Sequence, residues 1–143
     1  MLPVLPSLRR LGAWILGSIL VVSLAACSNL GQPPRKVLLQ ALDLQVQLTQ
    51  AELALALALP APEGKPSLNR VRLEQQGSTE VEGQKAWRLQ GRFDWQLPGD
   101  PLKVDSGFEV LLLRGEQGQT WRLVRPPSAA APQWRSYPLV NGA

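Results

Sequence analysis

The chain has 143 residues, with 15 lysines and arginines against 11 acidic residues, a net charge of +4, one cysteine and no histidine. The absence of histidine excludes a Ser-His-Asp triad and histidine metal ligands, and a single cysteine excludes an intramolecular disulfide. No glycine-rich nucleotide-binding motif and no nucleic-acid-binding motif is present. We therefore expect a non-enzymatic protein with no catalytic residues, no metal, no cofactor and no nucleic-acid partner.

The N-terminal segment has the pattern of an export signal. Arg9 and Arg10 precede an uncharged, apolar run from Leu11 to Ala26 that ends in small residues. A basic start, an apolar stretch and small residues before a break are typical of a secretory signal peptide. The run is shorter than the ~20 residues that a membrane-spanning helix needs. Residues 1–26 are therefore predicted to be a signal peptide and not part of the fold.

The end of this run, Leu24-Ala25-Ala26-Cys27, resembles the lipobox of bacterial lipoproteins. The resemblance implies that signal peptidase II cuts between Ala26 and Cys27, and that Cys27 is lipidated, with diacylglycerol on its thiol and an acyl chain such as palmitate on its new amino group. Residues 27–34 would then be the lipidated cysteine and a tether. Because Ser28 and not aspartate follows the cysteine, the resemblance implies a periplasm-facing membrane protein, on the outer membrane if the host has two membranes.

Three other interpretations of the N-terminus remain open. Cys27 could be the first residue after an ordinary secretory signal by chance. The apolar run could be an uncleaved anchor, although it contains Gly12, Gly17 and Ser18. The arginine pair could belong to a twin-arginine signal. Against that pattern, the apolar Leu8 directly precedes the pair, and Gly12 stands two places after it, where a bulky apolar residue is expected.

Residues 35–58 are predicted to form one long helix, because Leu, Ala, Gln and Glu dominate the segment and it contains no Gly or Pro. Alternation between Leu42 and Leu48 also fits a strand, so the two periods disagree. We expect Pro60 and Pro62 to end the helix. The stripe expected to face the core consists of Val37, Ala41, Leu44, Leu48, Ala51 and Leu55.

After Gly64 the apolar residues recur every second position, which predicts strands at about 68–75, 85–97, 104–114 and 120–124. Gly91 interrupts the apolar face of the second strand, as at a bend or bulge. Residues 97–101 and 115–118 are predicted turns. The expected inner faces are Trp87, Leu89, Phe93, Trp95 and Leu97 on the second strand and Phe108, Val110 and Leu112 on the third.

These elements predict an α+β fold in which one long N-terminal helix packs on a curved, four-stranded antiparallel meander. The expected domain covers residues 35–125, and residues 126–143 form a Pro/Ala-rich connector and a C-terminal extended segment. The order of a long helix followed by strands resembles the cystatin-like and nuclear-transport-factor-2-like folds. Together with its leader, the chain also resembles small exported bacterial lipoproteins of unknown function.

The candidate partner surface consists of Trp134, Tyr137, Arg88 and Arg92. The alternative for the tryptophans is that they fill the core, and the alternative for the arginines is cross-strand pairing with acidic residues. The leading functional hypothesis is a lipid-anchored accessory or interaction module that meets a protein partner in the cell envelope. A carrier of a small apolar ligand between helix and sheet is the alternative, and a carboxylate enzyme the third possibility.

Overall fold

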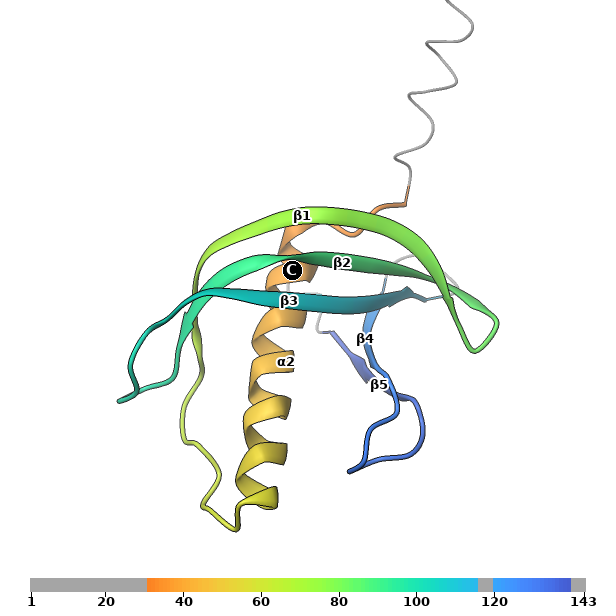
Figure 1. Cartoon of the computed structure of the whole chain (residues 1–143). Helices are drawn as coiled ribbons and strands as arrows, with labels where there is room; N and C mark the ends of the chain where they lie inside the picture. The colour runs from red at the N-terminus through yellow and green to blue at the C-terminus, as the bar shows by residue number, and fades with distance from the viewer. Residues whose placement is uncertain (1–30, 116–119, 140–143) are drawn as a thin grey trace, which may run out of the picture. The chain divides into compact units, whose positions relative to one another are not determined.

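The computed structural model describes residues 31–115 and 120–139, so the predicted signal peptide, Cys27 and most of the loop at 115–118 lie outside the described residues. The described elements belong to one compact unit, Pro33–Ala143. The strands form a five-stranded antiparallel sheet in the order β1-β2-β3-β4-β5, arched over one helix (Figure 1). The elements are α2 (Arg35–Ala56), β1 (Ser67–Val81), β2 (Gln84–Gln96), β3 (Lys103–Arg114), β4 (Trp121–Arg125) and β5 (Arg135–Pro138).

The α+β prediction is confirmed, but the expected number of strands was wrong. The C-terminal segment forms a fifth strand, β5, which pairs antiparallel with β4 and places Tyr137 opposite Leu123. The sequence signal was weak because β5 has only 4 residues and follows a Pro/Ala-rich connector. The C-terminal segment is therefore part of the sheet.

Helix α2 has 22 residues and ends at Ala56, two residues before the predicted end. Ala58 adopts a left-handed conformation with φ 53°, and the Leu59 amide donates to the Ala54 carbonyl at 2.8 Å. A left-handed residue followed by a hydrogen bond back over five residues is the Schellman arrangement that terminates many helices. The backbone therefore turns sharply before Pro60 is reached.

The predicted buried stripe of α2 was partly wrong. Leu55 is 82% exposed, and Leu44 and Leu48 are only partly buried against the core. The alternating run from Leu42 to Leu48 contains residues of two helical faces, so periodicity alone could not show which face meets the sheet. The residues of α2 that are buried are Val37, Leu38, Ala41, Leu42, Val46 and Ala54.

Strand β1 is longer than predicted because it forms a tight hairpin with β2. Glu82 and Gly83 connect the strands with φ angles of 49° and 78°. Two successive positive φ angles are typical of a type I′ turn, whose twist matches that of the flanking strands. The hairpin extends β1 to Val81, six positions beyond the predicted end at residue 75.

Irregular pairing at one end of the sheet produces its curvature. The β1–β2 register shifts between Asn69 and Arg72 and again between Leu73 and Gln75, and the β2–β3 register shifts between Phe93 and Trp95. Bulges of this kind bend a strand and increase its twist. The prediction of a bulge beside Gly91 is confirmed, since Gly91 lies opposite Leu73 at the second shift.

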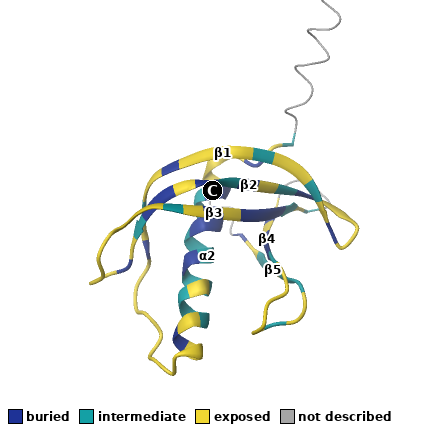
Figure 2. Cartoon of the chain, in the orientation of Figure 1, coloured by how far each residue is buried: buried dark blue, intermediate teal, exposed yellow. Residues whose placement is uncertain are grey.

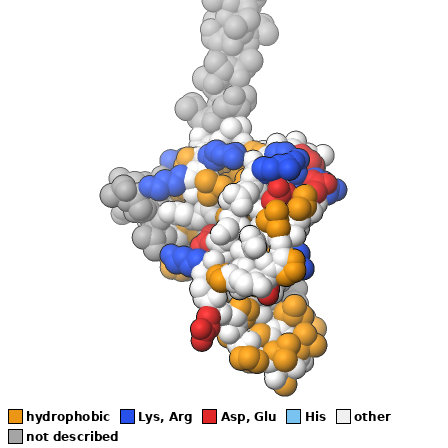
Figure 3. Space-filling view, turned by 90° about the vertical axis from the view of Figure 1, so that its left-hand side faces the viewer, with side chains coloured by type: hydrophobic (Ala, Val, Ile, Leu, Met, Phe, Trp, Pro, Cys, Tyr) orange, Lys and Arg blue, Asp and Glu red, His pale blue; other side chains and the backbone are white. Residues whose placement is uncertain are grey.

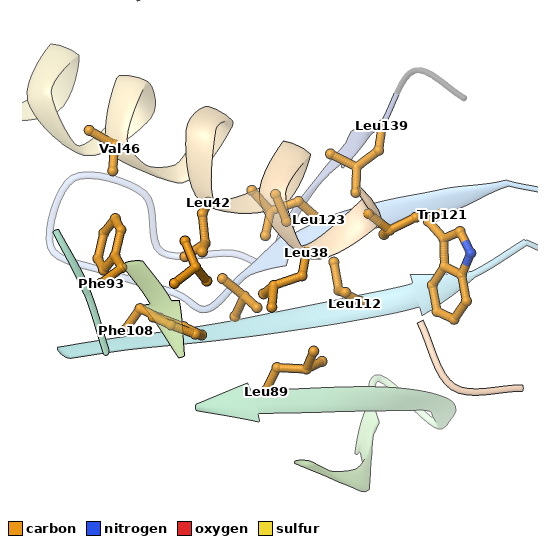
Figure 4. Close-up of a cluster of buried hydrophobic side chains, with 14 of the residues drawn as sticks. Leu38, Leu42, Val46, Leu89, Phe93, Phe108, Leu112, Trp121, Leu123 and Leu139 are labelled. Carbon is orange, nitrogen blue, oxygen red and sulfur yellow. The ribbon is translucent and has the colours of Figure 1, made fainter. Parts of the chain in front are cut away.

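The main core lies between α2 and the concave face of the sheet (Figures 2 and 4). Phe108, Val110 and Leu112 are buried as predicted, and Phe93 and Phe108 meet edge to face with ring centroids 5.6 Å apart. Leu89 and Leu97 are buried as expected, whereas Trp87 and Trp95 are half-buried at the margin of this core. The main core therefore depends more on leucine, valine and phenylalanine than on these two tryptophans.

A second, smaller cluster covers part of the convex face. It consists of Val81, Ala86, Leu111 and Val124, with Leu113 and Trp134 packed against it. Leu111 alternates with the inward-facing Val110 and Leu112, so β3 is apolar on both faces at this point. No helix among the described residues has the length and hydropathy needed to span a membrane.

Candidate interaction surface

Arg88 and Arg92 project from the convex face of β2, where each meets an acidic side chain. Arg88 Nε lies 3.5 Å from Glu109 Oε1, and Arg92 contacts both Asp105 at 3.4 Å and Glu74 at 3.8 Å. These side chains are about half exposed. Cross-strand ion pairs on a solvated sheet account for this arrangement. The arginines are therefore compensated in charge and do not form a cationic patch by themselves.

The other two predicted surface residues lie on opposite faces of the sheet. Trp134 packs against the convex-face cluster, whereas Tyr137 packs against the main core on the concave face. Both are half-buried. The structure therefore brings Trp134 to the same face as Arg88 and Arg92 but separates Tyr137 from all three.

An ion-pair cluster that sequence reasoning missed joins α2 to the last two strands. Arg125 Nη1 and Arg135 Nη1 donate to the same oxygen, Glu52 Oε1, at 2.8 Å and 2.7 Å. Arg125 also donates to Thr49 Oγ1 at 3.3 Å. Arg125 and Arg135 are register partners across β4 and β5, which places both guanidinium groups beside the helix.

The cluster at Glu52 is partly buried, and it shifts the ionisation of its members. The hydrogen bond from Arg135 holds the pKa of Glu52 below its ordinary value of 4.5, against the opposing effect of burial. The same hydrogen bond raises the pKa of Arg135. The charged form of Glu52 is therefore favoured, and its ion pairs with Arg125 and Arg135 join α2 to β4 and β5.

The most exposed apolar feature is the C-terminal end of α2. The exposed fractions of Leu53, Leu55, Leu57 and Leu59 are 50%, 82%, 58% and 58%. We call these leucines and the exposed residues that follow them the apolar tip, and Figure 3 shows its hydrophobic side chains gathered at one end of the molecule. The tip residues are Leu53, Leu55, Ala56, Leu57, Ala58, Leu59, Pro60, Ala61 and Pro62.

The apolar tip could have been recognised in the sequence, but helical periodicity did not identify it. No charged residue occurs between Glu52 and Glu63. The heptad-like stripe assigned Leu55 to the core, because periodicity does not show where the covering sheet ends. Contiguous exposed apolar patches of more than a few hundred Å² are uncommon in monomeric proteins and mark contact sites.

Two grooves flank the C-terminal half of α2. One of about 220 Å³ lies between the helix and the sheet and includes Val46, Phe93 and Trp95 among its lining residues. The other, of about 280 Å³, lies between the helix and the connector to β1 and includes Leu48, Ala61 and Leu97. Ligand pockets usually measure ~300–1,000 Å³, so both grooves fall below that range. The second groove continues onto the apolar tip through Ala61 and Pro62.

Within the two described ranges, no group of three or more His, Cys, Asp or Glu side chains is arranged to hold a metal ion. Comparison of the chain with protein-family models, with curated proteins and with solved structures gave no match. No family is therefore assigned, and the resemblances to lipoproteins and to the cystatin-like folds stay predictions. The geometry offers a contact surface at the end of α2.

Proposed function

We propose that the protein is a lipid-anchored, non-catalytic interaction module of the cell envelope, exported by residues 1–26 and held at a membrane through Cys27. The domain would present the apolar tip to an apolar segment of a second envelope protein. The observation that carries the proposal is the exposure of Leu55 and its neighbouring leucines at the end of a helix that is otherwise packed.

The tip is an ordered part of the fold. The Leu57 amide donates to Leu53 at 3.1 Å, and the Leu59 amide donates to Ala54 at 2.8 Å. The backbone of the tip is therefore fixed before any partner arrives. Because the ordering entropy has already been lost, a partner gains the full benefit of burying the leucines.

Burial of the tip would supply a substantial driving force. Moving an exposed leucine side chain into an apolar contact is favourable by ~1.5–3 kcal/mol when burial is complete. The tip leucines are only partly exposed, so each contributes less than that. Several of them together still suffice for a specific, reversible contact.

The position of the tip relative to the tether favours a protein partner. Helix α2 has 22 residues and is therefore about 33 Å long, and its N-terminal end follows directly from the tether. The tether Ser28–Pro34 reaches at most ~25 Å when fully extended. The tip therefore meets the anchoring bilayer only if the helix lies along its surface or turns back toward it; in the other orientations the tip faces away from the membrane.

The anchor is tested by changing Cys27 to Ser. Intact-mass analysis of the native protein from its host should show a lipidated Cys27 at the N-terminus. The variant should remain unprocessed and lack the lipid. An unlipidated N-terminus in the native protein would refute the anchor.

The tip is tested separately with a photocrosslinking amino acid in place of Leu55 in the full chain, in native membranes. Leu102 is an exposed leucine outside the tip, with an exposed fraction of 47% against 82% for Leu55, and serves as the control. A protein crosslink at position 55 and none at 102 is expected. Crosslinks to lipid at position 55, or equal crosslinking at both positions, would contradict the proposed contact.

A further inference from the structure

Strand β1 forms one edge of the sheet, and no described residue pairs with its outer side. It has 15 residues, which is long for an edge strand. Unpaired edges are templates for pairing with another chain, so proteins usually protect them with bulges, charges or covering groups. The two halves of β1 differ sharply in such protection.

The first half of β1 is protected in several ways. Two register shifts interrupt its pairing before Gln75, and Arg70 adopts a left-handed conformation with φ 49°. Arg35 of α2 donates from Nη2 to the Val71 carbonyl oxygen at 3.0 Å. These features bend this part of the edge and occupy its backbone, so another strand cannot align with it.

The second half has almost none of these features. From Gln75 to Val81 the register with β2 is regular, and Gln75 to Thr79 carries no charge. The exposed band on this part of β1 is visible in Figure 2, and a polar hollow of about 550 Å³ lies along it. A Cβ at Gly77 would meet no atom within 4 Å. The only ionic protection within this stretch is Glu80.

We propose that this half of β1 pairs with the same segment of a second copy of the chain, antiparallel about a two-fold axis at Ser78. In an antiparallel pair, the side chains of directly opposite residues lie on the same face of the sheet. A two-fold axis perpendicular to the sheet must therefore pass midway between a residue and the same residue of the second copy. With the axis at Ser78, Gln76 of each copy lies opposite Glu80 of the other, and an amide donor meets a carboxylate. With the axis at Gly77, Glu74 would lie opposite Glu80, which places like charges together.

The paired state would be one continuous sheet across two copies. The axis runs perpendicular to the sheet, so both α2 helices lie on the same face and the apolar tips stay exposed. Only a short segment pairs, so the affinity in solution is low. If the chain is lipid-anchored as proposed, confinement to a membrane raises its effective concentration and favours the pair, although the pairing itself does not need the lipid.

The test uses a chain that begins at Ser28. Among the described residues, every buried one lies between Pro33 and Leu139, within the compact unit Pro33–Ala143, so this chain contains all of the described core. Sedimentation equilibrium at about 10 µM to 1 mM should show a monomer–dimer equilibrium in the accessible affinity range. A monomer at all concentrations would overturn the proposal. Because this chain carries no lipid, a failure of the pairing proposal is distinct from a failure of the proposed anchor.

Matched charge variants test the register. Ser78→Lys places two ammonium groups opposite each other at the axis and should raise the dissociation constant by up to about fivefold. Gln76→Lys adds the same charge opposite Glu80 and should leave the dimer intact or strengthen it. Circular dichroism melts establish that both variants are folded. If Ser78→Lys does not weaken the dimer, the two copies pair through another segment, and the proposal fails.

Cysteine crosslinking gives an independent measurement, because the chain from Ser28 contains no cysteine. Directly opposite residues in an antiparallel pair have Cα atoms ~4.5–5.5 Å apart, within the ~4.4–6.8 Å that a disulfide requires. Ser78→Cys should form a disulfide-linked dimer under mild oxidation. Ser67→Cys, exposed on the same strand but outside the regular stretch, should not. Equal crosslinking of both variants would overturn the proposal.

Discussion

Asp94 Oδ1 accepts a hydrogen bond of 2.8 Å from the backbone amide of Asp105. Asp94 is only 3% exposed, and its other oxygen lies 3.5 Å from Arg70 Nε. Arg70 and Asp105 both adopt left-handed backbone conformations, with φ angles of 49° and 52°. One buried carboxylate on β2 therefore stabilises irregular backbone on both neighbouring strands, where the sheet bends.

Changing Asp94 to Ala should destabilise the domain by ~1–3 kcal/mol, because the Asp105 amide loses its acceptor within a partly buried site. Denaturant melts of the chain from Ser28 would measure this change in the free energy of unfolding. Asp100→Ala, in the exposed turn after β2, is the control and should change stability by less than ~0.5 kcal/mol. Equal effects of the two substitutions would contradict this role of Asp94.

Gly91→Ala should destabilise the domain by more than ~2 kcal/mol, because the added methyl group has no room. A Cβ at Gly91 would overlap the Arg72 carbonyl oxygen and lie 2.8 Å from Phe108 Cζ. Gly77→Ala is the matched control in the same sheet, since its Cβ meets nothing within 4 Å. In thermal melts, the stability of Gly77→Ala should be close to that of the parent. A similar loss of stability in both variants would show that the space at Gly91 is not limiting.

Leu112→Ala should cost ~2–5 kcal/mol, because Leu112 is fully buried between α2 and the sheet. Leu55→Ala removes the same atoms from a side chain that is 82% exposed and should change the free energy of unfolding by less than ~0.5 kcal/mol. Denaturant unfolding of the two variants compares them directly. A large loss for Leu55→Ala would mean that the apolar tip is buried in solution.

Glu52 should make stability depend on acid pH. Its pKa in the folded state lies below the ordinary 4.5, so the cluster stabilises the fold above pH 4.5 and this contribution is lost as the pH falls through the lowered pKa. Glu52→Gln should therefore lower stability at pH 7 and approach the parent at strongly acid pH. Urea melts at a series of pH values measure the difference. A difference that does not change with pH would contradict the ionic role.

Ala58→Gly should stabilise the domain, by ~0.5–1 kcal/mol, because Ala58 occupies the left-handed position after α2 at φ 53°. Glycine adopts this conformation without the cost that a Cβ imposes. Ala51→Gly, inside the helix, is the opposing control and should destabilise by a similar amount. Thermal melts that rank the two variants in the reverse order would show that the turn at Ala58 is not formed.

Part of the candidate surface was predictable from the sequence. The solvent-facing positions of Arg88 and Arg92 followed from alternation along β2, and the structure confirms them. The same alternation also assigned Asp94 to the solvent face, yet Asp94 is buried. The alternation along β2 continues here, since Phe93, Trp95 and Leu97 all pack in or against the main core. Asp94 is buried because the Asp105 amide and Arg70 contact its carboxylate where the β2–β3 register shifts, and the sequence of one strand does not show a shift in its pairing.

The sequence by itself determined the order of one helix and a following meander, together with the inner faces of the regular strands. Side chains alternate between the two faces of any strand, so the inner face can be assigned without knowing which strand pairs with it. Only the tertiary structure decided which side of α2 packs against the sheet and at which residue this contact ends. It also decided that Glu52 meets Arg125 and Arg135. Burial and ion pairing depend on contacts between segments far apart along the chain. Local periodicity does not contain that information.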